Sequence, residues 1–352
     1  MEACKLTQYS KGSGCGCKIS PAVLKEILHT TDELPQDGRL WVGSETHDDA
    51  AVFGWDEENG LISTTDFFMP MVDDAYTFGK IAAANALSDV YAMGGSPLMA
   101  LAILGWPIEK LPASQASQVL EGARFMCRLA GIPLAGGHSI ESTEPIFGLS
   151  VNGRVKKTEL LRNSGAQVGD VLYLTKPLGA GIITAAMKRG QLRDTAHLEA
   201  CVSYMSTLNK IGEHIASHVE VHAMTDVTGF GFAGHCLEMC EASGLTARID
   251  FSALPVYPFL QEYTAAHVYP DMTMKNYSHY ASKITQLSLP QLLVMCDPQT
   301  SGGLLIAVPQ RAAAALEQRM RDFGCGAFAR AVGVMVEREE KSVRVDTRAA
   351  LG

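Results

Sequence analysis

"YTFGKIAAANALSDVYAMGGSPLMALAILGW", residues 76–106, decides the fold of this chain. Its first half is rich in alanine and ends at two glycines, which predicts a helix that stops near residues 94–95. Its second half is apolar and predicts a strand. No charge occurs in residues 90–108, but glycines and prolines interrupt that run. We therefore interpret it as a helix end, a turn and a buried strand rather than a membrane span.

Strands and helices on both sides extend this stretch into an α+β unit. Residues 48–55 and 61–68 predict two strands, residues 114–131 a second helix, and residues 146–155 a further strand. We expect neighbouring strands of this unit to be antiparallel.

A second α/β-type unit follows the polar segment 156–170 and closes with a predicted hairpin over residues 331–345. The sequence thus predicts three parts. They are a flexible Gly-rich arm at 1–20, an N-terminal domain at 21–155 and a C-terminal domain at 156–352.

Composition restricts the class of protein. The 352 residues carry a net charge of −9 and no run rich in Lys or Arg, which argues against nucleic acid as the main partner. An anionic substrate would therefore need a local cationic site or a metal. The first ten residues hold no apolar signal segment, so we expect a cytoplasmic protein without a membrane anchor. Nine scattered cysteines match neither a disulfide framework nor a paired zinc motif.

The Gly-rich arm contains "KGSGCGCKIS", residues 11–20, with two cysteines and a lysine in the spacing C-x-C-K. A loop of this composition is expected to bury almost nothing, so packing does not explain it. It approaches a phosphate-binding P-loop, but Cys17 replaces the required glycine and Ile19 the metal-binding hydroxyl. A zinc knuckle, a redox pair and a broken P-loop all remain open for these residues alone.

Aspartates recur at the ends of apolar segments. They are Asp48, Asp49, Asp66, Asp89 and Asp226. Any one of them could cap a helix or a turn. Asn85 and Asp89, however, lie four residues apart on one face of the Ala-rich helix, where a solvated surface would more often carry Lys or Glu. Two carboxylates about 4 Å apart repel by about 4 kcal/mol, so a cluster needs protons or cations. Oxygen ligands alone favour Mg²⁺, which commonly carries nucleotide phosphates.

A rival interpretation comes from "GFGFAG", residues 229–234, which fits the dinucleotide-binding fingerprint G-x-G-x-x-G. A strand-like segment precedes it, and Asp250 lies where a ribose-binding acid is expected. The polar insertion "TDVT" before the first glycine argues against it. The alternative is that these glycines allow close packing beside a metal-binding Asp226.

Long ordered blocks resemble one known family over almost the whole chain. They are "LTQYSKGSGCGCKISP", "DDAAV", "STTDFFMPMVDD", "NALSDVYAMGGSP", "LAGGHSIE", "PIFGLSVNG", "MTDVTGFGFAGH" and "CDPQTSGGLL". The chain resembles the selenophosphate synthetase (selenide, water dikinase) family. The resemblance implies two α+β domains of the aminoimidazole ribonucleotide synthetase-like fold. It also implies a homodimer formed by pairing of the N-terminal sheets, with ATP near the interface.

The same resemblance implies roles for individual residues. Cys15 matches the catalytic cysteine that handles selenium, and Lys18 is expected to neutralise phosphate charge. Asp49, Asp89 and Asp226 match the Mg²⁺ ligands. The positions that match ATP contacts are Lys18, Thr46, His47, Asp48, Asp66, Asp89, Gly137, His138 and Ser139. Lys18 would also lower the pKa of the Cys15 thiol if it lies close to it.

The implied reaction converts ATP, selenide and water to selenophosphate, AMP and phosphate. The γ-phosphoryl group is expected to leave first, before the bound ADP is hydrolysed. The resemblance leaves open whether free selenide or a selenium-delivery protein is the donor. The alternative functions are a thiol or selenium carrier without turnover, and a dinucleotide-binding protein.

Three smaller features have a structural interpretation beside the functional one. His138 is either a phosphate contact or a turn cap. The segment 297–303, "DPQTSGG", either lines the site with backbone N–H groups or, as we favour, forms a turn into the last strand. Four cysteines in apolar surroundings are expected to be core residues. They are Cys127, Cys236, Cys240 and Cys296.

Overall fold

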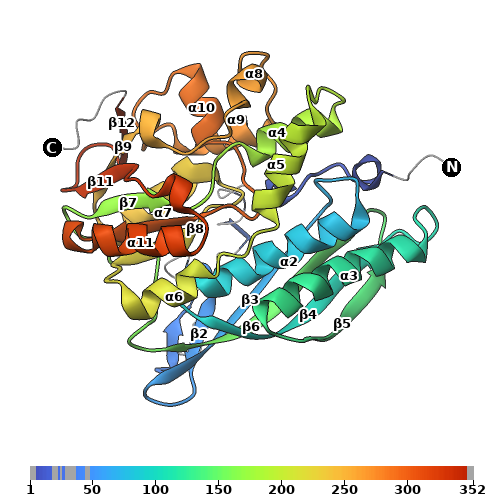
Figure 1. The fold of residues 1–352 in the computed structure, drawn as a ribbon, viewed down its shortest axis with the longest axis horizontal. Helices are drawn as coiled ribbons and strands as arrows, with labels where there is room; N and C mark the ends of the chain where they lie inside the picture. Colours follow the sequence, from blue (N-terminus) through green and yellow to red (C-terminus); the bar gives the residue numbers. More distant parts are fainter. Residues whose placement is uncertain (1–4, 18–22, 24–25, 28–36, 44–47, 347–352) are drawn as a thin grey trace.

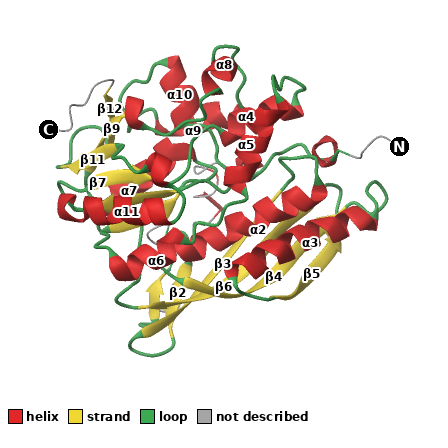
Figure 2. Ribbon diagram, viewed as in Figure 1, coloured by secondary structure: helices red, strands yellow, loops and turns green. Residues whose placement is uncertain are grey.

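Two six-stranded sheets and the helices around them make up the described part of the protein (Figures 1 and 2). The computed structural model describes residues 5–17, 23, 26–27, 37–43 and 48–346. The helix start expected at Ser20 and Pro21 lies outside the described residues.

The N-terminal sheet has the strand order β1-β2-β3-β6-β4-β5. Its strands are β1 Leu40–Val42, β2 Ala51–Gly54, β3 Asn59–Phe68, β4 Ser96–Trp106, β5 Leu134–Glu141 and β6 Ile146–Lys156. The predicted strands of this unit are present. The expectation that all neighbours are antiparallel is wrong for β4 and β5, which are parallel because helix α3 crosses back between them.

Helix α2, Ala75–Ala92, is the centre of the molecule. The Asp74 side chain caps it by accepting from the Thr77 N–H at 2.7 Å, and Gly94 ends it with φ +73°. Almost every residue of α2 is buried, because the helix contacts β3 and β6 on one side and β8, α5 and α6 on the other. Small alanine side chains make this burial on all sides sterically feasible.

Helix α3, Ala113–Ala130, lies beside α2, and the two helices cover one face of the N-terminal sheet (Figure 1). Their backbones approach closely at Gly79 and Gly122. A Cβ atom on Gly79 would lie 1.9 Å from the Val119 carbonyl oxygen, and one on Gly122 would lie 2.0 Å from that of Tyr76. Among the described elements, no helix covers the opposite face of the sheet (Figure 2).

We predict that Gly79→Ala destabilises the protein by about 2 kcal/mol, because the new methyl group forces the two helices apart. In an uncrowded helix the same change stabilises by about 1 kcal/mol, so the sign is diagnostic of the close approach. Thermal unfolding measures the effect. Gly38→Ala is the control, since no atom lies within 4 Å of its added Cβ. An unchanged or raised melting temperature for Gly79→Ala would contradict the prediction.

The C-terminal sheet has the order β12-β9-β11-β7-β10-β8. Its strands are β7 Val171–Leu174, β8 Ala223–Asp226, β9 Thr246–Asp250, β10 Leu304–Val308, β11 Gly333–Val336 and β12 Val343–Asp346. The predicted closing hairpin is wrong, because β9 lies between β11 and β12 and pairs with both. The turn before β10 therefore does not lead into the last strand.

The helices of this half surround the second sheet (Figure 1). They are α4 Ala180–Lys188, α5 Thr195–Met205, α6 Ile211–His218, α7 Gly231–Ser243, α8 Leu260–Thr264, α9 Asp271–Tyr280, α10 Leu289–Met295 and α11 Ala313–Asp322. Short 3₁₀ turns occur at Leu6–Tyr9, Cys15–Cys17, Phe251–Ala253, Gln310–Ala312 and Gly326–Phe328.

The dinucleotide-binding alternative is not supported by this topology. The fingerprint needs parallel neighbouring strands on either side of the glycine turn, whereas β8 and β9 lie near opposite edges of the sheet. The glycines instead allow close approach, as expected in the alternative interpretation. A Cβ on Gly231 would meet the backbone of Cys296 and Asp297 at 2.9 Å.

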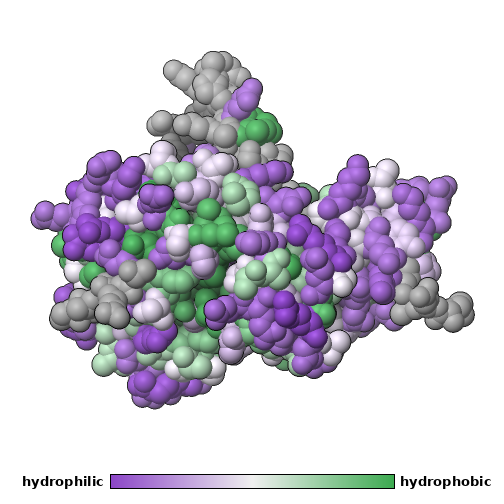
Figure 3. All heavy atoms as spheres, turned by 90° about the horizontal axis from the view of Figure 1, so that it is seen from above, coloured by the Kyte–Doolittle hydropathy of each residue, from purple (hydrophilic) through white to green (hydrophobic). Residues whose placement is uncertain are grey.

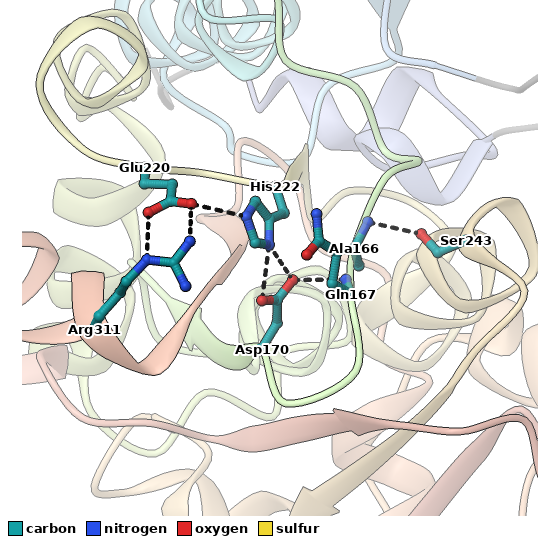
Figure 4. Close-up of polar contacts among 7 residues, drawn as sticks. All are labelled: Ala166, Gln167, Asp170, Glu220, His222, Ser243 and Arg311. Carbon is teal, nitrogen blue, oxygen red and sulfur yellow. Dashed lines mark hydrogen bonds and ion pairs between the residues drawn. The ribbon is translucent and has the colours of Figure 1, made fainter.

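An ion-pair network anchors the segment between the two sheets (Figure 4). The His222 Nδ1 lies 2.8 Å from Asp170 Oδ1, at the end of the segment, and its Nε2 lies 3.3 Å from Glu220 Oε1. Arg311 in turn pairs with Glu220. The network attaches the start of β7 to the segment before β8 and to the turn that precedes α11.

Hydrophilic side chains cover much of the face in Figure 3, with hydrophobic areas between them. Among the described residues, no helix is both long enough and apolar enough to cross a bilayer. This agrees with the interpretation of residues 90–108 as a helix end, a turn and a strand. The expectation that the strand is buried holds for one face of β4 only, because Leu98, Met99 and Leu101 are exposed.

Candidate active site

Cys15 lies at the meeting point of the arm, α2 and the loop before β10. Its backbone N–H donates to Thr300 Oγ1 at 3.1 Å, and its Sγ lies 3.2 Å from Asn85 Oδ1. Only 1% of the residue is exposed. The expectation that this arm buries almost nothing is therefore wrong for residues 5–16, because two other elements supply a binding surface for them.

The arm is held by contacts with both halves of the molecule. Thr7 donates through its N–H and its hydroxyl to Asp73 of the N-terminal half. The Lys188 ammonium group at the end of α4 donates to the carbonyl oxygens of Ser10 and Gly12, both at 2.8 Å. Leu6 is fully buried. These contacts fix the backbone on which Cys15 lies.

The loop Asp297–Gly303 forms the opposite wall. Ser301 has a φ of +51°, in the left-handed region that non-glycine residues rarely adopt. Its N–H donates to Asn85 Oδ1 at 2.7 Å, and its carbonyl accepts from Lys176 Nζ at 2.9 Å. The loop is thus both a turn into β10 and a wall of the site.

Asn85 connects the cysteine to the aspartates. Its Oδ1 accepts from Ser301 and faces the Cys15 thiol, while its Nδ2 donates to Asp66 on β3. Because both ends of the amide are engaged, its orientation is defined. The residue is fully buried on the face of α2 that also carries Asp89, as the spacing of the two residues predicts.

A cavity of about 260 Å³ lies on the far side of Asn85. Acidic side chains dominate its described lining, together with threonines, Phe230 and His235. The acidic residues are Asp48, Asp49, Asp66, Asp89, Asp226 and Glu238. All five aspartates singled out in the sequence therefore converge, although they come from different strands, loops and a helix.

Hydroxyl groups fix three of these carboxylates. Thr225 Oγ1 donates to Asp49 Oδ1 at 2.9 Å, Thr64 Oγ1 to Asp89 Oδ2 at 2.5 Å, and Ser88 Oγ to Asp226 Oδ2 at 2.6 Å.

The second oxygen of Asp49 is buried and has no hydrogen-bond donor among the described residues. Burial raises the pKa of Asp49 well above its usual value, and the charges of Asp226 and Asp89 raise it further.

The donor set fits a hard cation. An orphaned buried carboxylate oxygen beside two further carboxylates is the chemistry that Mg²⁺ satisfies. Among the described residues, however, no three acidic, histidine or cysteine side chains already form a closed ligand group. The carboxylates share the cavity without being assembled into a coordination shell.

Comparisons with known proteins agree with this architecture. The AIR synthase related protein families match as an N-terminal domain at residues 47–155 and a C-terminal domain at 167–346. A selenide, water dikinase of Shewanella sp. (strain W3-18-1) is 55% identical over 315 residues, which are 90% of this chain and 89% of the relative. One of Pseudomonas putida is 51% identical over 344 residues, 98% of this chain and 99% of the relative. The chain belongs to the selenide, water dikinase family.

Solved structures show the same fold outside the selenide, water dikinase family. Hydrogenase maturation protein HypE in complex with ATP has a TM-score of 0.65 at 19% identity and covers 85% of each chain. Thiamine-monophosphate kinase from Stenotrophomonas maltophilia has a TM-score of 0.63 at 19% identity, over 90% of this chain and 93% of that one. At these identities the likeness concerns the fold alone.

Not every residue assigned by resemblance to the selenide, water dikinase family lies at this cavity. Gly137, His138 and Ser139 are on the edge strand β5, which β4 and β6 separate from β3 and Asp66. They are exposed, and His138 caps no turn. Three further positions, Lys18, Thr46 and His47, lie outside the described residues.

The sequence motifs did not predict the role of Lys176, which holds the loop that contacts Cys15. Lys176 is 5% exposed, and its Nζ donates to the carbonyls of Thr207 and Ser301 at 2.7 and 2.9 Å. Burial lowers its pKa to about 7. The available signal was a lysine two residues after the apolar strand β7, because positions that close to a core strand are often buried. The contact of Thr300 with Cys15 had no local signal. The four cysteines predicted to be core residues are buried, as expected.

Proposed function

We propose that this protein makes selenophosphate from ATP, selenide and water and releases AMP and phosphate. The observation that carries this proposal is the placement of the Cys15 thiol against Asn85, which in turn binds Asp66 of the acidic cavity. A soft nucleophile site and a hard cation site therefore lie one side chain apart. Membership of the selenide, water dikinase family supports the same reaction.

Asp49, Asp89 and Asp226 would hold Mg²⁺, which supplies positive charge against the ATP phosphates when it is bound. The chain's own residues then bind and orient the substrates. Asp48 and Asp66 line the same cavity and are proposed ATP contacts. Asp48 is positioned by the N–H of Asn163, which donates to its Oδ1 at 2.8 Å.

Cys15 is proposed to hold or deliver selenium, and Lys18 to neutralise phosphate charge. Selenide is already a strong nucleophile, so the protein's contribution is to position it and to exclude water until the phosphoryl group is in place. The burial of Cys15 between α2 and the loop Asp297–Gly303 supports this role, because bulk water does not reach the thiol. A selenium-delivery protein is a further proposed partner. A cytoplasmic location is a further part of this proposal.

We further propose a homodimer formed through the N-terminal sheet. The face that α2 and α3 leave uncovered exposes large apolar side chains on β3, β4 and β5. They are Phe67, Leu101 and Ile140, exposed by 51%, 38% and 61%. A second copy would cover this face. It would also allow the partner's Gly137, His138 and Ser139 to approach the acidic cavity that they do not reach within one chain.

Ile140→Asp is therefore expected to produce a monomer and to weaken ATP binding about 10-fold or more, because a charge enters an apolar interface. Sedimentation velocity gives the oligomeric state and calorimetry the ATP affinity. Leu129→Asp is the matched control, since Leu129 is 53% exposed on α3, in the helical layer. A dimeric Ile140→Asp protein with unchanged ATP affinity would exclude this interface.

Phosphorus NMR of the protein with ATP, Mg²⁺ and selenide tests the reaction itself. We expect AMP, phosphate and a phosphorus signal coupled to selenium to appear together. A carrier without turnover would yield none of them, and their joint absence would remove the proposed function.

A further inference from the structure

A second, larger cavity lies beside Cys15 and has no role in the reaction described above. Its volume is about 1070 Å³. The arm from Lys11 to Gly16 forms one wall, and helices α4 and α9 form the others. Thr300, whose hydroxyl accepts the Cys15 N–H, lines it as well. The cavity therefore ends one residue from the catalytic thiol.

Positive charge dominates this cavity, whereas the chain as a whole carries −9. Its charged lining residues are Lys11, Lys188, Arg189, Lys275 and Asp271. Arg189 pairs with Asp271 at 3.2 Å. In the part of the chain that the structure describes, no carboxylate pairs with the side chain of Lys11 or Lys275. The positive charges of these two lysines can therefore attract an anion that enters the cavity.

The two sides of Cys15 thus have opposite electrostatic character. Toward Asn85 lies the acidic cavity, in which six carboxylates and no lysine or arginine are found among the described lining residues. Toward Thr300 lies the cationic cavity. An anion that approaches the acidic side without a cation meets repulsion, whereas ATP would reach it together with Mg²⁺. An anion that approaches through the cationic side is attracted and concentrated.

We propose that selenium reaches Cys15 as the hydrogen selenide anion through this cationic cavity, while ATP occupies the acidic side. This inference rests on the proposed function. Hydrogen selenide is a much stronger acid than a thiol. It has lost its first proton at neutral pH and is therefore an anion. Separate access lets the two substrates bind without passing one another. The arm, which Lys188 fastens, forms the wall between the cavity and the buried thiol, so selenide has to pass it to reach Cys15.

Lys275 and Lys11 are the residues to change, since both are exposed and Lys188 also holds the arm. We expect the double variant Lys11→Glu/Lys275→Glu to raise the KM for selenide about 10-fold, with kcat and the KM for ATP within about twofold of the parent. Added salt should raise the parent's KM for selenide and leave that of the double variant almost unchanged.

Three further variants make the experiment decisive. Lys210→Glu carries the charge change of one of these two substitutions at an exposed position outside both cavities and should keep the parent KM for selenide. Lys275→Arg should also keep it, whereas Lys275→Gln should raise it by a smaller factor than the double variant. Initial rates of AMP formation, measured without oxygen at varied selenide, give these values, and melting temperatures verify that each variant is folded.

The inference is overturned if the double variant keeps the parent KM and salt dependence, or if Lys210→Glu raises the KM equally. A parent protein that makes no selenophosphate would instead refute the proposed function, so the two failures are distinguishable.

Discussion

Replacing Cys15 with serine should lower selenide-dependent AMP formation by about 100-fold or more, while ATP binding persists. The serine hydroxyl can still donate to Asn85 Oδ1, from which the sulfur lies 3.2 Å away, so the arm keeps its docking contact. A hydroxyl is a much weaker acid than a thiol, and its oxygen is less polarisable than sulfur, so it is a poorer non-covalent contact for selenide. The loss should therefore appear in the selenide-dependent step and not in folding.

The measurement compares AMP formation with ATP affinity in the same preparation. Cys325→Ser is the control, because Cys325 is a partly buried free cysteine in the turn after α11. It should keep parental turnover. A Cys15→Ser protein that makes selenophosphate at the parental rate would refute the role assigned to this residue.

Asp49→Asn should have opposite effects on stability and on activity. In the metal-free protein, burial and the charges of Asp226 and Asp89 raise the pKa of Asp49 above its unfolded value. The folded protein then retains a proton that the unfolded chain releases above about pH 4. Folding stability consequently falls as pH rises from that value toward the folded pKa. Asparagine removes the charge and this loss.

We therefore expect the Asp49→Asn protein to melt about 2 °C or more above the parent in EDTA, with a gap that widens from pH 5 to pH 8. With Mg²⁺ the parent should gain stability and the variant much less, because one carboxylate ligand is missing. Activity with ATP and selenide should fall about 100-fold or more.

Scanning calorimetry at several pH values, with EDTA or Mg²⁺, measures these effects. Asp74→Asn is the matched control, since the Asp74 side chain caps α2 away from the cavity and asparagine caps equally well. Equal stabilisation of the parent and of Asp49→Asn by Mg²⁺ would exclude Asp49 as a ligand.

Local pattern predicted most elements of this fold. The double glycine at residues 94–95 and the alternation in β3 are readable because a helix stop and a half-buried strand each leave a short-range signature. The pairing of strands cannot be predicted from such short-range signals. The parallel β5 and the insertion of β9 between β11 and β12 depend on which strands find each other across long separations.

For the candidate site, too, some features could be predicted from the sequence and others depend on the tertiary structure. The sequence by itself determined the chemistry: a thiol on a Gly-rich arm, an amide and a carboxylate four residues apart on α2, and a series of aspartates suited to a hard cation. These are properties of residue types and of spacing within one element.

Only the tertiary structure decided which of these groups act together. Cys15 meets Thr300 across 285 residues, and Ser88 meets Asp226 across 138. Such contacts arise because α2 is buried between the two halves and presents side chains to both. No periodicity in the chain encodes that placement. The same burial turned a Gly-rich segment, expected to bury almost nothing, into the wall between an acidic and a cationic cavity.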